Sequence, residues 1–218
     1  MTFVKHLGVL VMVALLTARV IAQGTPTSAP SDASKAAPNP WAYALTTSGY
    51  VVPKGQSFAS PDFTADRNWL HLEARYNYEA LKTASLWAGY NFSVGKKLEL
   101  QATPMVGAVF GDLNGFAPGC LLTLTYNRVQ LYAANEYVFD LQNRGGSFFY
   151  TWDQITYSPL EWLQVGLVSQ RTRVYQTGLD VQRGVLAGFT YKKVNFTTTV
   201  FNFGWTTPTE VLALGINF

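Results

Sequence analysis

The sequence has little charge and almost no cysteine. Of its 218 residues only 13% are charged, while 48% are hydrophobic and 15% are aromatic; a soluble domain usually carries roughly 25% charged residues. So much apolar material excludes disorder for most of the chain. The single Cys120 excludes a disulfide scaffold. A formal net charge of +3 gives no electrostatic basis for a nucleic-acid partner, so we expect none.

Residues suited to metal or nucleophilic chemistry are equally scarce. His71 is the one histidine after residue 22, and with one cysteine it cannot form a metal-ligand cluster. The sequence has no Gly-x-Ser-x-Gly nucleophile elbow. The glycines and lysines of 89–97 do not have the spacing of a phosphate-binding loop. We therefore expect no metal and no cofactor.

The N-terminus has the pattern of a secretory signal peptide. Lys5 supplies a positive charge, an apolar run of ten residues follows from Leu7 to Leu16, and Ala22 is a small residue at a suitable cleavage position. Ten apolar residues are too few to span a bilayer, which takes roughly 17–25. We predict a signal peptide over 1–22 and a flexible tether rich in Pro, Ser and Ala over 23–40, because that stretch cannot bury a core.

From residue 41 onward the hydrophobic period is two. In 70–76, for example, apolar and polar residues alternate, which is typical of a strand with one apolar face. Short breaks are expected at 93–96, 127–128, 158–160 and 192–193, and longer ones at 111–119, 141–146, 174–180 and 206–210. Short turns at one end and longer loops at the other are typical of an up-and-down meander.

The pattern predicts an all-β fold over 41–218: an antiparallel, up-and-down transmembrane β-barrel of 12 strands. The alternative is 10 strands, if 57–64 is a loop and 41–52 folds elsewhere. The expected strands are 41–52, 57–64, 68–79, 83–92, 97–109, 119–127, 129–139, 147–157, 161–172, 182–192, 194–204 and 210–218.

The charged residues decide which face of the strands is the outer one. In each strand the alternate positions that carry apolar residues are almost free of charge, and the charged residues occupy the other positions. Charge is normal in a wet lumen but costly inside a narrow soluble barrel. The face of Arg171 stays open, because a bulge would reverse it. The predicted lumen-lining residues, forming either a pore wall or an ion-pair network, are Trp69, His71, Glu73, Arg75, Glu99, Gln101, Tyr132, Glu136, Asp153, Gln164 and Gln170.

Aromatic residues on the apolar parity gather near the strand ends. In antiparallel strands this placement makes two belts, as in the aromatic girdles of membrane barrels at the level of the lipid headgroups. The predicted lipid-facing girdle consists of Tyr76, Tyr78, Tyr90, Phe92, Tyr126, Tyr137, Phe139, Phe189, Tyr191, Phe201, Phe203 and Trp205.

The last eight residues, Val-Leu-Ala-Leu-Gly-Ile-Asn-Phe, carry a more specific pattern. Leu212, Leu214, Ile216 and Phe218 share one parity, and the chain ends on phenylalanine. This segment resembles the C-terminal strand of bacterial outer-membrane β-barrel proteins. The resemblance implies a Gram-negative outer-membrane protein that the barrel assembly machinery recognises through these four residues, with outer-membrane lipids around it and both termini in the periplasm.

Three functions are compatible with such a barrel. The first is a monomeric, porin-like pore for passive transport of small polar solutes through a charged lumen. The second is a non-conducting barrel with a structural or surface-interaction role, whose lumen is filled by paired charges. The third is an outer-membrane enzyme acting on lipid or lipopolysaccharide with His71 as general base; no other residue supports it, so no catalytic residue is assigned.

Overall fold

The computed structural model describes residues 41–53, 55–174, 180–204 and 207–218. The predicted signal peptide over 1–22, the predicted tether over 23–40 and Trp205 lie outside these ranges. Within them the chain is almost entirely β-strand, with a single 3-10 turn, η1 (Arg144–Gly146). No helix in the described ranges has the length and hydropathy needed to cross a membrane.

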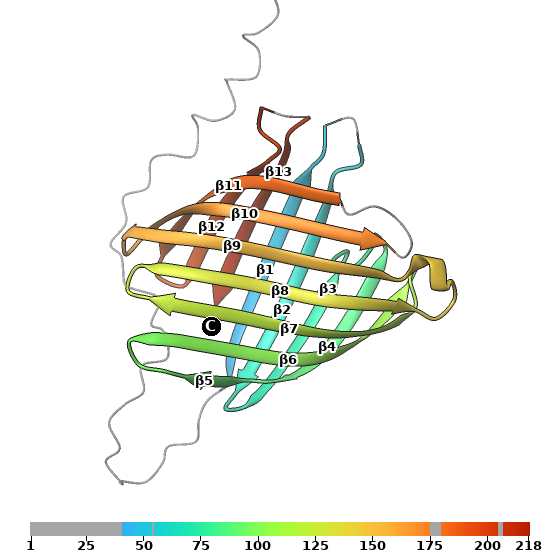
Figure 1. Cartoon of the computed structure of the whole chain (residues 1–218), viewed down its shortest axis with the longest axis horizontal. Helices are drawn as coiled ribbons and strands as arrows, with labels where there is room; N and C mark the ends of the chain where they lie inside the picture. Colours follow the sequence, from blue (N-terminus) through green and yellow to red (C-terminus); the bar gives the residue numbers. More distant parts are fainter. Residues whose placement is uncertain (1–40, 54, 175–179, 205–206) are drawn as a thin grey trace, which may run out of the picture.

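Successive strands run in opposite directions and form one antiparallel sheet (Figure 1). They are β1 (Ala42–Val51), β2 (Phe58–Arg67), β3 (Leu70–Tyr76), β4 (Thr83–Tyr90), β5 (Phe92–Val94), β6 (Leu98–Gly111), β7 (Gly115–Tyr126), β8 (Val129–Asp140), β9 (Phe148–Leu160), β10 (Leu163–Val174), β11 (Asp180–Tyr191), β12 (Val194–Phe201) and β13 (Thr209–Asn217).

The sheet closes into a barrel. β1 pairs with β13, where Tyr43 and Phe218 exchange two backbone hydrogen bonds of 3.0 and 2.9 Å, and β4 pairs with β6. β4 and β5 pair with successive parts of β6, so together they occupy one position in the barrel. The prediction of twelve strands is thereby confirmed, with β5 as an additional short segment, and the alternative of ten is wrong.

Proline explains the break between β4 and β5. The ladder register places Pro104 of β6 opposite the end of β4, between the last β4 pair, Gly89–Met105, and the first β5 pair, Phe92–Ala102. Proline has no N–H group to donate to a neighbouring strand. The ladder is therefore interrupted at Tyr90 and Asn91 and resumes at Phe92.

Short turns connect the strands at the end of the barrel where residues 41 and 218 lie. Asn68, Asn127 and Lys192 have φ angles of 54°, 51° and 55°, each at the first position of a two-residue turn. Positive φ in such turns matches the right-handed twist of the paired strands. The opposite end carries the longer connections, and we refer to these ends as the turn end and the loop end.

Several predicted breaks differ from the structure. Residues 93 and 94 of the break expected over 93–96 belong to β5, and β13 begins at Thr209, within the break expected over 206–210. β7 begins at Gly115, so only 112–114 remain of the long break expected over 111–119, and β9 continues through Ser158–Leu160. Proline suggested a loop in both places, together with glycine in the first. A strand tolerates proline where its backbone N–H is not needed by the neighbouring strand.

Large apolar side chains cover the outer face of the barrel. Near the loop end they include Tyr76, Phe110, Phe116 and Phe139, and near the turn end they include Tyr90, Tyr126, Tyr157 and Phe189, each at least 39% exposed. Leu212, Leu214, Ile216 and Phe218 also lie on the outer face, 40–56% exposed. These exposed aromatic residues therefore lie near both ends of the barrel.

Two apolar clusters fill parts of the interior. One combines Trp87, Met105, Val109, Leu113, Ala117 and Val138. The other combines Val168, Leu186, Phe201 and Val211, with Tyr50 and Trp152 packed against it. In the second cluster the rings of Trp152 and Phe201, from strands three positions apart, meet edge to face at 5.5 Å. The lumen is therefore narrow.

Candidate functional site: a charged network across the lumen

β3 supplies the centre of the lumen network. His71, Glu73 and Arg75 alternate with the outward Leu72 and Ala74, and all three inward side chains are no more than 5% exposed. The strand register also places the predicted Glu99, Gln101, Tyr132, Glu136, Gln164 and Gln170 on the lumen face. A period of two in the sequence is sufficient to give these placements.

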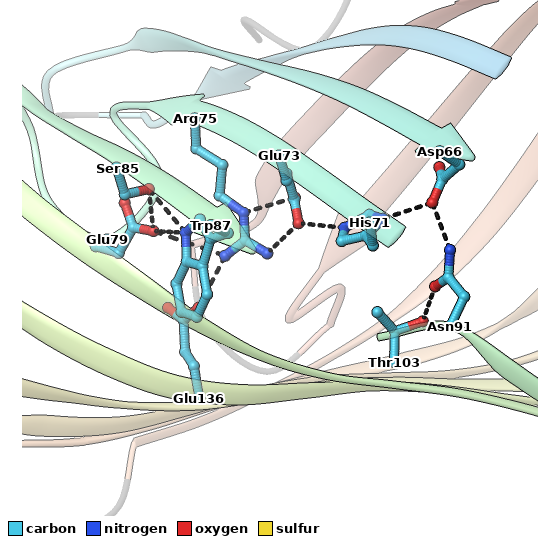
Figure 2. A network of polar contacts seen from close by, with 10 residues as sticks. All are labelled: Asp66, His71, Glu73, Arg75, Glu79, Ser85, Trp87, Asn91, Thr103 and Glu136. Atoms are coloured by element: carbon cyan, nitrogen blue, oxygen red, sulfur yellow. Dashed lines mark hydrogen bonds and ion pairs between the residues drawn. The ribbon is translucent and has the colours of Figure 1, made fainter. Parts of the chain in front are cut away.

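Arg75 links β3 to β8 through the lumen (Figure 2). Its Nε and Nη2 donate to the two carboxylate oxygens of Glu73 at 2.6 and 3.0 Å, a bidentate pair. Its Nη1 donates to Glu136 Oε2 at 2.8 Å. Glu136 is on β8, four barrel positions from β3, so this ion pair spans the lumen.

Aromatic rings and a loop carboxylate enclose the same guanidinium. The Arg75 Cζ lies 4.3 Å from the ring centroid of Tyr78 and 4.6 Å from that of Trp87, both within cation–π range. Glu79, in the β3–β4 connection, is 3.6 Å from Arg75 Nη1. Ser85 Oγ and Trp87 Nε1 donate to Glu79 Oε1 at 2.6 and 3.2 Å. The guanidinium is thus held in one position.

The network continues toward the turn end through His71. Its Nδ1 lies 2.8 Å from Asp66 Oδ1, and its Nε2 lies 3.2 Å from Glu73 Oε2. Asn91 Nδ2 donates to the same Asp66 oxygen at 2.6 Å, and Thr103 Oγ1 donates to Asn91 Oδ1 at 2.6 Å. A continuous polar chain therefore runs from Thr103 to Glu136 (Figure 2).

Acidic groups outnumber basic groups in this network. Asp62, which pairs in register with Arg75, adds a further carboxylate on the lumen face. The acidic members are Asp62, Asp66, Glu73, Glu79 and Glu136, and the basic members are His71 and Arg75. Among the described residues, Asp62 Oδ1, Glu79 Oε2 and Glu136 Oε1 are buried with no hydrogen-bond partner. This network therefore contains more carboxyl groups than cationic groups.

The contacts of His71 bear directly on its proposed role as a general base. Both ring nitrogens face carboxylates, Asp66 on one side and Glu73 on the other. A general base needs a nitrogen within hydrogen-bond reach of the proton that it removes. Here both nitrogens are engaged, so the geometry favours a structural histidine that separates two carboxylates.

Four predicted placements differ from the structure. Trp69 lies in the β2–β3 turn, 55% exposed, where its ring stacks on the outward Tyr90 at 5.5 Å instead of lining the lumen. Asp153 shares the outer face with Ala133 and Ser169. Tyr78 and Phe201, expected in the girdle, point inward. Trp69 and Tyr78 lie beyond strand ends, where side chains no longer alternate between the two faces with a period of two.

The remaining girdle residues lie on the outside. Phe92, Tyr137, Phe139, Phe189 and Tyr191 share the outer face with Tyr76, Tyr90 and Tyr126. Phe203, after the end of β12, is 77% exposed.

Sequence reasoning missed Asp62, Asp66 and Glu79. The alternation of Asp62 and Asp66 with Phe63 and Ala65 was the available signal, and it indicates an inward acidic face on β2. Glu79 had no such signal, because it lies in a connection and reaches the lumen through the path of that loop.

Comparisons with known proteins support the fold. No family model matches the sequence, and no curated protein matches it. Among solved structures, a KdgM porin in complex with disordered oligogalacturonate is similar, with a TM-score of 0.56 and 10% identity over 80% of this chain and 98% of that chain. At this identity the similarity shows the fold alone, and it confirms the resemblance to outer-membrane β-barrel proteins at that level.

Larger porins match more weakly. The Pseudomonas aeruginosa OccK5 (OpdH) and OccK3 (OpdO) structures both give TM-scores of 0.43, with 10% and 13% identity over 78% and 76% of this chain. The chain spans only 62% and 58% of the length of these two proteins. Of these three structures, the KdgM porin is the one that supports the fold.

Proposed function

We propose that this protein is a narrow pore of the outer membrane that passes small polar solutes and prefers cations. The observation that carries the proposal is the excess of carboxylates in the lumen around Arg75. Rings and clusters of acidic side chains favour cations in pores. The outer face, apolar with two aromatic belts, suits a bilayer around the barrel.

The part of the lumen nearer the turn end supports passage of polar solutes. Glu99 and Gln101 lie near the turn end of β6, where Gln101 Nε2 donates to Glu99 Oε1 at 2.9 Å. Gln130, Gln154 and Gln164 share this lumen face on neighbouring strands. Amide and carboxylate groups can replace part of the hydration shell of a solute, so this region would serve as a vestibule in front of the Arg75 network.

The proposal places the turn end in the periplasm and the loop end outside. Both ends of the described chain, residues 41 and 218, lie at the turn end. Short periplasmic turns and longer external loops are the rule in barrels of this class. Recognition by the barrel assembly machinery would use the outward Leu212, Leu214, Ile216 and Phe218.

A non-conducting barrel is the second candidate. Arg75 is 4% exposed, its pair with Glu136 crosses the lumen, and two apolar clusters occupy neighbouring volume. A filled lumen would stabilise the barrel and pass nothing. In that case the function would lie in the loops.

Liposome swelling separates the two candidates. We expect liposomes containing the purified protein to swell in iso-osmotic solutions of small solutes, fastest for a cationic amine, more slowly for a neutral sugar and slowest for a carboxylate. The Glu99→Gln variant should reduce this order of preference, whereas Glu161→Gln, an exposed change in the β9–β10 turn, should leave it unchanged. Folded protein that gives no swelling with any solute would contradict a pore.

A further inference from the structure

The outer face of β9, β10 and β11 carries charge away from the strand ends, whereas the outward Arg67 on β2 and Glu210 on β13 lie at or next to a strand end. Asp153, Arg171 and Arg183 point outward. Asp153 pairs in register with Ala133 and Ser169, Arg183 pairs with Ser169, and Arg171 pairs with Thr151 and Val181, all on the outer face. Arg171 Nη2 forms an ion pair with Asp153 Oδ2, and Thr151 Oγ1 donates to Asp153 Oδ1 at 3.1 Å. The outward positions of β3, β4, β6 and β7 hold no charged side chain.

The position of this charge along the strand is unexpected for a membrane barrel. On the outer face of β9, Asp153 lies four residues from Phe149 and four residues from Tyr157, which are 38% and 48% exposed. These rings are at opposite ends of the strand and belong to the two aromatic belts. The Asp153–Arg171 pair thus lies between the belts, where bare charge is unfavourable in lipid.

An apolar groove starts at the same place. It has a volume of about 810 Å³ and its lining includes Asp153 and Arg183 together with Leu131, Leu124 and Leu167. Arg183 is three residues from the loop end of β11, whereas Leu131 and Leu124 are two residues from the β7–β8 turn. The groove therefore has Arg183 toward the loop end, beside Val200 and Phe203, and leucines toward the turn end.

The charges around the groove do not balance. Asp153 neutralises one guanidinium, that of Arg171, whose Nε is buried and has no hydrogen-bond partner among the described residues. Arg183 is exposed, and no ion pair joins it to a described residue. An unpaired guanidinium beside an apolar groove favours a bound anion.

We propose that this groove binds a phosphorylated acyl lipid of the surrounding bilayer. The phosphate would lie against Arg183 and Arg171, where charge-assisted hydrogen bonds to guanidinium groups are strong. One acyl chain would run along the leucine-lined part toward the turn end. The order of polar and apolar lining matches a lipid whose headgroup is at the loop-side surface and whose chain points to the bilayer centre.

Phosphatidic acid is the probe that tests this proposal. The purified full chain in a neutral detergent is titrated with phosphatidic acid, and bound lipid is counted by native mass spectrometry. We expect one tightly retained molecule, with diacylglycerol and phosphatidylcholine retained far less. The Arg183→Gln variant should bind phosphatidic acid about tenfold more weakly, as expected for loss of one charged hydrogen-bonding group.

Two further variants keep the test specific. Ala133→Phe fills the groove without changing charge and should also reduce retention, while Arg67→Gln removes an outward arginine on β2 and should have no effect. Equal retention by the native chain and Arg183→Gln would overturn the proposal, as would equal retention of diacylglycerol. Binding of inorganic phosphate alone would contradict the acyl part of the site.

The other possible occupant of this wall is a second copy of the chain. Analytical ultracentrifugation of the same samples distinguishes it. We expect a monomer with bound lipid. A dimer that the Arg183→Gln substitution dissociates equally with and without added lipid would overturn the proposal. None of these results depends on conductance, so the lipid site and the pore can fail separately.

Discussion

β3 and the β9–β10 pair distribute their charged residues in opposite directions. On β3, His71, Glu73 and Arg75 point into the lumen and the outer face is apolar. On β9 and β10, Asp153 and Arg171 point outward, while Trp152 and Val168 on the inner face pack into an apolar cluster. One side of the barrel is polar inside, and the other is partly polar outside.

The difference shows that the partners of a charge decide which face it can occupy. Arg75 is satisfied inside because Glu73, Glu79 and Glu136 surround it. Phe201 and Trp152 fill the lumen beside β9 and leave it apolar there. Charges on β9 and β10 are then outward, where they need each other and, in our proposal, an anionic lipid.

Removing each charge pair should give opposite results. Glu73→Leu with Arg75→Leu leaves Glu136 buried without its partner, and we expect a loss of about 3–5 kcal/mol in the free energy of unfolding. Asp153→Leu with Arg171→Leu replaces an outward pair by apolar groups and should be neutral or stabilising in phosphatidylcholine liposomes. Urea unfolding followed by tryptophan fluorescence measures both. Equal losses of stability would contradict the conclusion that the charges of β3 point inward and those of β9 and β10 point outward.

Phenylalanines on the two faces of β12 should differ in the same way. Phe201 is fully buried in the interior cluster, so Phe201→Ala should cost about 3 kcal/mol through the cavity that it leaves. Phe196 is on the outer face and 40% exposed, and in detergent Phe196→Ala should cost much less. The same urea titration checks the pair, and a larger effect at Phe196 would reverse the assignment of faces.

His71 should matter for stability and not for chemistry. His71→Gln keeps one hydrogen bond of the two that join Asp66 and Glu73, so a loss of about 1 kcal/mol is expected. Lipid hydrolysis assayed with and without calcium should show no activity that depends on this residue. Hydrolysis that the wild type performs and His71→Gln lacks would favour the enzyme instead.

Phe218 should have the smallest effect on the folded barrel. It is 56% exposed and its ring centroid lies 5.9 Å from that of Tyr43, so Phe218→Ala should lower stability by less than about 1 kcal/mol. If the last strand acts as the assembly signal, the amount of barrel inserted in cells should fall strongly. Phe189→Ala, another outward ring at the turn end, is the matched control and should assemble normally.

The sequence predicted the strand count and most of the lumen wall because alternation is regular on β3, β4, β6 and β8. It failed on β9, where Phe148, Phe149, Tyr150 and Trp152 put large rings on both parities. Neither face of β9 is clearly apolar in the sequence, so only the general preference of charge for the lumen places Asp153 there, and this prediction is wrong. Only pairing with β8 and β10 determines its face.

The network itself could not be predicted from spacing. Arg75 and Glu136 are 61 positions apart, and their contact depends on closure of the barrel and on the width of the lumen at that level. Glu79 takes part because a loop turns inward. These contacts are set by three-dimensional packing, which a period of two does not encode.

The reversal potential of single channels in a planar bilayer tests the central claim most directly. With a KCl gradient across the membrane, we expect steady conductance and a reversal potential that indicates a preference for K⁺ over Cl⁻. Glu99→Gln should reduce this potential, and Glu161→Gln should leave it unchanged. A folded barrel that stays silent, or one that prefers Cl⁻, would contradict a cation-preferring pore.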